Sequence, residues 1–402
     1  MSAPVSQPTS PMVRRLQQEV DLPLLALTAA LVALGLVMVA SASMEMGARD
    51  FGNAWHFLQR QVLFAALGTM AAVAAWNVPL ARWERAGPWL LALFLLILVV
   101  VLLPGVGRTV NGATRWIPIG AFNLQVAELA KLLVVMYLAG YIVRHYSTLR
   151  LQLAGFVRPL VVLGAGTVLL LLQPDFGGAA IMLAIGMGML FLAGARLSQF
   201  LALGGTIAAG MAVAAVAAPY RMARLTAFMD PWQDPFASGF QLTQSLIAIG
   251  SGGVTGSGLG GSVQKLFYLP EAHNDFLFAV FAEEFGFFGV LVLIALFAGL
   301  VWRCLRIGLE AQRSGHAFGA HLSFGVAIWL GLQAALNMGV NMGLLPTKGM
   351  TLPFLSYGGS SLIVSMIAVG LVLRVAREAR TPAPAPVPRR RSRAARQSGG
   401  AA

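Results

Sequence analysis

Long apolar runs alternate with short polar segments along almost the whole chain. Each run holds about 20 residues, enough for an α-helix to cross the hydrocarbon core of a bilayer. The pattern predicts ten membrane spans, with the residue ranges 22–44, 60–78, 87–104, 124–143, 158–173, 177–194, 199–218, 276–302, 317–341 and 351–373. Only "QPDFG" separates the fifth run from the sixth, and its proline, aspartate and glycine predict a turn.

These runs predict an all-α, polytopic membrane protein. Hydrophobic residues make up 58% of the 402 residues, charged residues 11%, and the mean hydropathy is +0.77. A soluble chain of this length could not bury so much apolar surface. The first run is too long for the hydrophobic region of a signal peptide, so we expect it to be retained. The single cysteine, Cys304, excludes an intramolecular disulfide and is expected to be a small buried residue.

The net charge of +13 is informative mainly through the positions of the basic residues along the chain. Basic residues lie between the spans and in the C-terminal tail, which argues against a nucleic-acid partner. More of them fall on the side of the two termini, so both termini are predicted to be cytoplasmic. The predicted organisation is a cytoplasmic arm at 1–20, a membrane domain at 21–376 and a disordered basic cytoplasmic tail at 377–402.

Two long connections face outward in this topology, at 105–123 and at 219–275. The second lies between the seventh and eighth spans, and connections of such length are usually functional. It contains "GSGGVTGSGLGGS", whose G-x-G-x-x-G is weak because no strand precedes it. We expect this glycine-rich stretch to be a flexible or close-packed loop over a cavity.

Two charges lie inside the fourth span. Glu128 and Lys131, in "QVAELAKLL", are three residues apart and therefore share one helical face, where they can pair. Ionisable residues within a membrane are candidates for function by default. The alternative is that the pair only joins two helices.

Basic residues on the outer side run against the usual charge bias of membrane proteins. A phosphate-bearing ligand would explain them, because guanidinium and ammonium groups bind phosphate oxygens. Placement of each long side chain at the membrane interface is the alternative. The outer set is Arg108, Arg115, Arg221, Arg224, Lys265 and Lys348.

The stretch "LPEAHNDFLFAVFAEEFG" concentrates scarce negative charge at the start of the eighth span. Asn274 or Asp275 could cap the helix that follows. Asp275 could instead be a general base at the boundary between membrane and water. A third interpretation joins Glu271, His273 and Asp275 in a site for Mg²⁺ or Mn²⁺. The residues by themselves leave these three readings open.

Four stretches together resemble the SEDS family (shape, elongation, division, sporulation) of bacterial cell-wall proteins. They are "NGATRWIPIGAFNLQVAELAKL", "QPDFGGAA", "DPWQDPFASGFQLTQSLIAIGSGGVTGSGLGGS" continuing into "LPEAHNDFLFAVFAEEFG", and "LLPTKGMTLPFLSYGGSS". The resemblance covers about residues 20–375 on the ten predicted spans. The last stretch is more similar to the division branch of the family than to its elongation branch.

The resemblance implies a peptidoglycan glycosyltransferase. Such an enzyme polymerises lipid II into β-1,4 glycan strands at the outer face of the cytoplasmic membrane, with inversion at the anomeric carbon and release of undecaprenyl pyrophosphate. The family's essential aspartate falls on Asp275, which is the predicted catalytic residue. The implied substrate-binding residues are Arg115, Glu128, Lys131, Glu271, His273, Lys348, Ser356 and Tyr357.

The chain reads "QVAE" at 125–128 where the family usually has "QPSE", so its fourth helix is expected to begin differently. The implied partners are lipid II, the nascent glycan strand, a class B penicillin-binding protein transpeptidase (FtsI) and other division proteins at the septum. No definite cofactor is implied, and a divalent cation (Mg²⁺ or Mn²⁺) is the one candidate. The alternatives are a lipid II flippase, an elongation-type polymerase and a non-catalytic scaffold.

Overall fold

The computed structural model describes residues 20–110, 112–120, 122–216, 228–235, 239–266, 268–346 and 349–381. The helices are α2 (Leu22–Phe51), α3 (His56–Asn77), α4 (Leu80–Arg85), α5 (Gly87–Val100), α6 (Val126–Arg144), α7 (Tyr146–Leu151), α8 (Leu153–Leu172), α9 (Phe176–Leu192), α10 (Leu197–Val216), α12 (Phe240–Gly252), α13 (Leu277–Arg313), α14 (Ala317–Asn341) and α15 (Gly359–Glu378). The strands are β1 (Arg108–Val110), β2 (Ala113–Ile119) and β3 (Phe122–Gln125).

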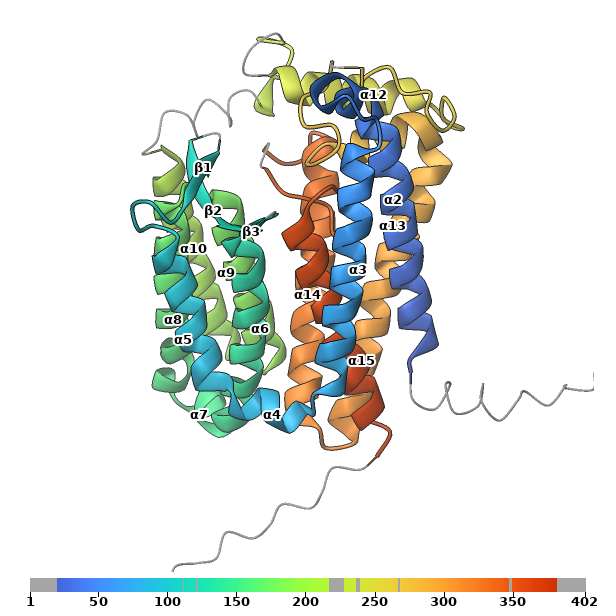
Figure 1. Cartoon of the computed structure of the whole chain (residues 1–402). Helices are drawn as coiled ribbons and strands as arrows, with labels where there is room; N and C mark the ends of the chain where they lie inside the picture. Colours follow the sequence, from blue (N-terminus) through green and yellow to red (C-terminus); the bar gives the residue numbers. More distant parts are fainter. Residues whose placement is uncertain are drawn as a thin grey trace, which may run out of the picture.

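The long helices run roughly side by side in two groups (Figure 1). One group holds α2, α3, α13, α14 and α15, and the other holds α5, α6, α8, α9 and α10. The small sheet and α12 lie at one end of the bundle, while α4 and α7 lie at the opposite end. Segments distant in sequence are therefore neighbours, and the first two long helices pack beside the last three.

A helix overlaps each of the ten apolar runs predicted from the sequence. In the described part of the chain, seven helices are long and apolar enough to cross a membrane, and α5 and α9 are shorter apolar helices. The chain is thus a mostly helical, multi-pass membrane protein. The bounds differ in two places: α13 continues to Arg313, and the last predicted span begins too early, because residues 349–358 precede α15 as an irregular segment.

The all-α prediction misses a three-stranded antiparallel sheet in the connection at 105–123. Its strand order is β1-β2-β3, with Trp116 opposite Gln125 and Pro118 opposite Asn123. Gly112 and Gly120 follow β1 and β2 with φ of 75° and 58°, a left-handed conformation that glycine adopts at little cost. The strands are short and the middle one contains a proline, so their sequence carries little strand signal.

The sheet leads directly into α6. This helix begins at Val126 after Gln125, whose backbone N–H donates to Ser360 Oγ of α15 over 2.9 Å. The proline of the "QPSE" pattern corresponds to Val126 in this chain. Proline lacks an N–H, but the hydrogen bond to Ser360 is made by residue 125, so it does not depend on which residue stands at 126. The start of α6 is therefore tied to the opposite helix group.

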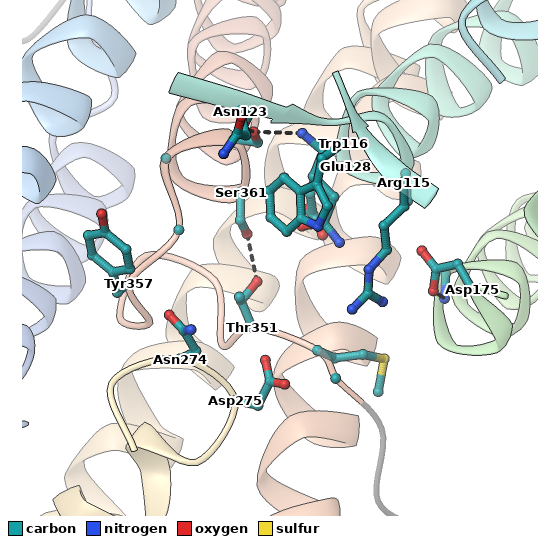
Figure 2. Close-up of a pocket in the computed structure, with 18 of the residues that line it drawn as sticks. Arg115, Trp116, Asn123, Glu128, Asp175, Asn274, Asp275, Thr351, Tyr357 and Ser361 are labelled. Atoms are coloured by element: carbon teal, nitrogen blue, oxygen red, sulfur yellow. Dashed lines mark hydrogen bonds between the residues drawn. The ribbon is translucent and has the colours of Figure 1, made fainter. Parts of the chain in front are cut away.

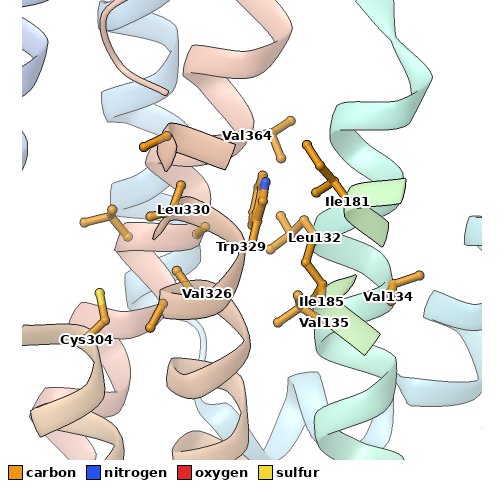
Figure 3. Close-up of a cluster of buried hydrophobic side chains, with 14 of the residues drawn as sticks. Leu132, Val134, Val135, Ile181, Ile185, Cys304, Val326, Trp329, Leu330 and Val364 are labelled. Carbon is orange, nitrogen blue, oxygen red and sulfur yellow. The ribbon is translucent and has the colours of Figure 1, made fainter. Parts of the chain in front are cut away.

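The core joins the two groups through α14. Trp329 is fully buried, and Figure 3 shows its ring facing Leu132 of α6 and Ile181 of α9. A buried tryptophan contributes a large apolar contact area at such a junction. Gly325, one turn away, leaves room for α6, because a Cβ there would lie 2.6 Å from Val135 Cγ1. The single Cys304 is buried, as predicted.

The eighth predicted span is interrupted at Gly286, which has φ 64° and ψ −164° inside α13. The glycine-rich loop docks at this break. The backbone N–H groups of Ser257 and Gly258 donate to the carbonyls of Glu283 and Glu284, and Phe287 N–H donates to Gly253 O. The stretch is therefore close-packed against a helix, and its first residues end α12.

Glu283 and Glu284, in the first half of α13, have partners in the glycine-rich loop, in the residues that follow it and in α2. Lys265 Nζ lies 2.8 Å from Glu284 Oε1, and Ser41 Oγ of α2 donates to the same oxygen. Glu283 accepts hydrogen bonds from Ser262 Oγ and from the backbone N–H of residue 263. These contacts anchor the loop to the first half of α13.

Candidate functional site

A cavity of about 310 Å³ lies between the two helix groups at the end that carries the sheet. Its wall combines residues of α3, β2, β3, α6, α9, α14 and α15 with the irregular segments at 271–275 and 349–358. Six residues predicted for the site line it: Arg115, Glu128, Lys131, Glu271, Asp275 and Tyr357. These six predicted residues therefore line the same cavity, although some of them lie more than 200 residues apart in the sequence.

Asp275 and Arg115 approach the same point in this cavity. A Cβ at Gly349 would lie 3.1 Å from Asp275 Oδ2 and 3.8 Å from Arg115 Nη2. Figure 2 shows Arg115 extending from β2 into the cavity, with Asp175 and Asp275 on either side of it. A carboxylate and a guanidinium thus face one space, one able to accept a proton and the other to stabilise an anion.

The predicted pair in α6 is formed. Lys131 Nζ lies 2.7 Å from Glu128 Oε1, and the two side chains are 3% and 6% exposed. Lys131 also donates to Gln333 Oε1 of α14 over 2.6 Å. Glu128 Oε2 has no partner among the described residues, and the side chain lines the cavity. The cavity therefore contains a buried acceptor that a ligand hydroxyl or amide could satisfy.

Gln333 connects this pair to the segment that precedes α15. Its Nε2 donates to Thr351 O over 3.0 Å, while its Oε1 accepts from Trp329 Nε1 over 2.8 Å as well as from Lys131. Thr351 in turn donates to Ser361 Oγ, as the dashed line in Figure 2 marks. The sequence analysis did not single out Gln333, because an isolated glutamine in an apolar span gives little signal.

Asp175 and Arg60 are cavity residues that the sequence analysis did not assign to the site. Asp175 was interpreted as part of a turn, and it does begin α9, where its Oδ1 accepts from Gly178 N–H over 2.8 Å. Arg60 of α3 lines the cavity wall together with Tyr357. Each of the two is a charged residue at the start of an apolar run, and this position was the sequence signal that could have assigned it to the site.

His273 and Ser356 lie beside the cavity but outside its lining. His273 is 6% exposed and packs against the rings of Phe57 and Tyr357 at centroid distances of 4.8 and 5.5 Å. Ser356 Oγ accepts from the backbone N–H of Leu352, so it stabilises a turn. Both residues support the segments that form the wall. Lys348, Arg221 and Arg224 lie outside the described residues.

His273 is a buried titratable residue beside the cavity. Its burial lowers the pKa from 6.5, because the imidazolium loses solvation, while the nearby Glu271 carboxylate opposes this effect in part. We therefore expect the imidazole to be neutral at pH 7.

The capping interpretation of Asp275 is wrong. The N-cap residue of α13 is Phe276, and Asn274 Nδ2 is turned back to donate to Glu271 Oε2. The metal interpretation is not supported either, since no group of three or more His, Cys, Asp or Glu side chains in the described ranges could hold a metal ion.

The fold and this cavity define a polytopic membrane protein that carries a charged cavity between two helix groups. The chain belongs to the FtsW/RodA/SpoVE family of cell cycle proteins, whose model matches residues 22–381. This agrees with the resemblance to the SEDS family.

Curated relatives are similar over nearly their whole length. A "probable peptidoglycan glycosyltransferase FtsW" of Thioalkalivibrio sp. (strain K90mix) is 76% identical over 95% of this chain and 96% of the relative. One of the same name from Thioalkalivibrio sulfidiphilus is 58% identical over 90% of this chain and 91% of the relative. The division branch is therefore the one that these relatives represent.

Solved structures share the fold. A chain from a peptidoglycan synthase complex, described as coordinating polymerization and crosslinking, is 31% identical with a TM-score of 0.73, over 90% of this chain and 98% of that one. The rod shape determining protein RodA of Thermus thermophilus is 30% identical with a TM-score of 0.66, over 89% of this chain and 97% of that one.

Proposed function

We propose that this chain is a peptidoglycan glycosyltransferase that polymerises lipid II during septal wall synthesis. The observation that carries the proposal is the placement of Asp275 and Arg115 at one point of a cavity that also holds the Glu128–Lys131 pair. The names of the relatives at 76% and 58% identity support the activity.

The reaction is a displacement at the anomeric carbon of an α-linked sugar on pyrophosphate. Asp275 removes the proton of the acceptor 4-hydroxyl, and the oxygen electron pair forms the new β-1,4 bond to carbon 1. The bond from carbon 1 to the phosphate oxygen breaks, and its electron pair leaves with undecaprenyl pyrophosphate. A single displacement of this kind inverts the anomeric carbon.

The leaving group carries negative charge, so a positive wall stabilises the transition state. Arg115 supplies a guanidinium within the cavity, and Arg60 lies on the same wall beside Tyr357. Lys348 belongs to the same proposal on the strength of the family resemblance. Glu128 and Lys131 hold the shape of the cavity, and the free Glu128 oxygen accepts a hydrogen bond from the sugar head group.

The proposal places the enzyme in the bacterial inner membrane at the septum, with ten spans and both termini in the cytoplasm. Residues 21–376 form the membrane domain, 219–275 the large extracytoplasmic loop, and 377–402 a basic tail. A class B penicillin-binding protein of the FtsI type would cross-link the product. The solved chain from a complex that coordinates polymerization and crosslinking supports such a partner.

The test is a polymerisation assay with purified protein and lipid II, with and without the transpeptidase partner. Asp275→Ala is expected to lower the rate by about 10²- to 10⁴-fold, the usual contribution of a general base. Ser323→Ala is the control, since Ser323 is buried in α14 away from the cavity lining. Its rate should equal that of the wild type.

The same preparation separates the alternatives. Lipid II transport across vesicles without polymer would identify a flippase. Normal polymerisation by folded Asp275→Ala would remove the base assignment. Activity that depends on an elongation-type partner instead of the division partner would favour the elongation role.

A further inference from the structure

One face of α14 carries three buried amide side chains at intervals of four residues: Gln333, Asn337 and Asn341. They are 1%, 2% and 0% exposed. Residues four apart lie one above the other on a helix, so the three amides form a continuous polar row within an apolar helix. Burying amides is costly unless they are hydrogen-bonded. The amide nitrogen of each of the three donates, whereas Asn337 Oδ1 has no partner among the described residues.

The two asparagines meet at the backbone of Asp275. Asn337 Nδ2 donates to Asp275 O over 2.9 Å, and Asn341 Nδ2 donates to the same oxygen over 3.0 Å. Two side-chain amides therefore hold a single carbonyl. The carboxylate that belongs to this residue projects into the cavity.

Asn341 also takes the place of a missing local cap. The N-cap residue of α13, Phe276, has an apolar side chain. The N–H of Ala279, three residues further along, donates to Phe276 O over 3.0 Å and also to Asn341 Oδ1 over 3.3 Å. An N-cap side chain normally satisfies this N–H from within the same chain segment. Here α14 caps α13 from outside, and Ser245 Oγ of α12 holds the Asn341 carbonyl over 2.8 Å.

Asn337 ties the opposite wall to the same point. Its Nδ2 donates to Met350 O in addition to Asp275 O, and Met350 follows Gly349, beside which Asp275 Oδ2 and Arg115 Nη2 meet. Gln333 continues the row by holding Thr351 O and Lys131 Nζ. One helix face thus sets the distance between the Asp275 segment, the 349–351 segment and the buried ion pair.

We propose that Asn337 and Asn341 are positioning residues that fix the Asp275 carboxylate for proton transfer. This inference rests on the proposed function, in which Asp275 is the base. The two amides touch the backbone of Asp275 and not the substrate, so their effect is on the chemical step. A misplacement of about 1 Å can cost on the order of 10²-fold in rate.

The experiment compares Asn337→Leu and Asn341→Leu with Ser323→Ala in full-length protein. Leucine shares the branching of asparagine at Cγ, with a larger volume, and removes the donors. Each preparation is assayed for kcat and KM with lipid II and for its thermal midpoint in detergent. We expect kcat to fall by at least about tenfold in both leucine variants while KM stays within about twofold. The Ser323→Ala control should match the wild type.

Two results would overturn the inference: unchanged kcat in folded leucine variants, or a kcat loss no larger than the accompanying loss of folded protein. If a leucine variant does not fold, Asn337→Ala or Asn341→Ala, which also removes the donor without adding volume, is assayed in the same way. Asp275→Ala, measured in parallel, distinguishes a failure of the proposed function from a failure of this inference. An active Asp275→Ala defeats the proposed function, whereas inactive Asp275→Ala beside fully active asparagine variants defeats this inference alone.

Discussion

Lys131 Nζ lies 2.7 Å from Glu128 Oε1 in an environment where neither side chain is more than 6% exposed. Removing one member of a buried pair leaves an uncompensated charge. Lys131→Met is therefore expected to destabilise the protein by about 3–5 kcal/mol and to abolish polymerisation. Thermal unfolding in detergent and the lipid II assay measure the two effects.

The double variant Lys131→Met/Glu128→Leu is the matched control. An apolar replacement of a whole buried pair is often neutral or stabilising, so the double variant should recover stability but not activity. Recovery of both would mean that the pair is only structural. No recovery of stability would mean that the unpaired charge is not the source of the loss.

Gly349 leaves the space that Asp275 and Arg115 share. Alanine there would place its Cβ 3.1 Å from Asp275 Oδ2, so the carboxylate must shift by a few tenths of an ångström. We expect Gly349→Ala to lower kcat about tenfold with little change in the thermal midpoint, because the glycine is exposed. Gly164→Ala, at an open position in α8, is the control and should keep full activity. Equal activity of the two variants would contradict the prediction.

The break in α13 depends on a glycine at position 286, where the backbone of the glycine-rich loop passes close to the helix. Gly286 has φ 64°, and a Cβ there would overlap the backbone N of Gly256. Gly258→Ala provides the comparison, since φ is 89° but the surrounding space is open. Its cost should be the backbone strain alone, about 1–2 kcal/mol.

Gly286→Ala should cost clearly more than Gly258→Ala, because strain and overlap add. Thermal unfolding of the two variants under the same detergent conditions tests the ranking. Proteolysis of the 253–262 loop should also become faster in Gly286→Ala. An equal loss in both variants would show that the docking of the loop adds nothing to the strain.

The burial of His273 predicts a dependence of stability on pH. Its pKa is below 6.5 in the folded protein, because burial disfavours the imidazolium, and returns to about 6.5 on unfolding. The unfolded state therefore binds more protons between the two pKa values. The stability contribution of His273 is complete above about pH 6.5 and is lost as the pH falls through the folded pKa.

His273→Phe removes the titration while retaining a ring against Phe57 and Tyr357. The thermal midpoint of the wild type should fall between about pH 7 and pH 5, and that of the variant should fall less. Parallel pH profiles would contradict the assignment of this dependence to His273.

Some features of this protein follow from short stretches of sequence. Each apolar run of about 20 residues is sufficient to require a helix in a bilayer, because the backbone must satisfy its own hydrogen bonds there. The pairing of Glu128 with Lys131 needs only their spacing on one helix. The turn at "QPDFG" needs only residues that end one helix and begin the next.

Other features needed the packing of distant segments. The sheet at 108–125 has weak strand propensity and is completed by pairing and by the contact between Gln125 and Ser360. Asp175, Arg60 and Gln333 reach the cavity only because α9, α3 and α14 surround it.

The start of α13 shows most clearly the difference between what local sequence determines and what tertiary structure determines. The sequence by itself determined that a helix begins near Asp275, and it left open a local cap that does not form. Only the tertiary structure decided that Asn341, 62 residues beyond Ala279, supplies a second acceptor for the N–H of Ala279, and that Asn337 holds the Asp275 carbonyl. Local spacing predicts contacts along one helix, whereas hydrogen bonds between helices depend on which faces the whole fold brings together.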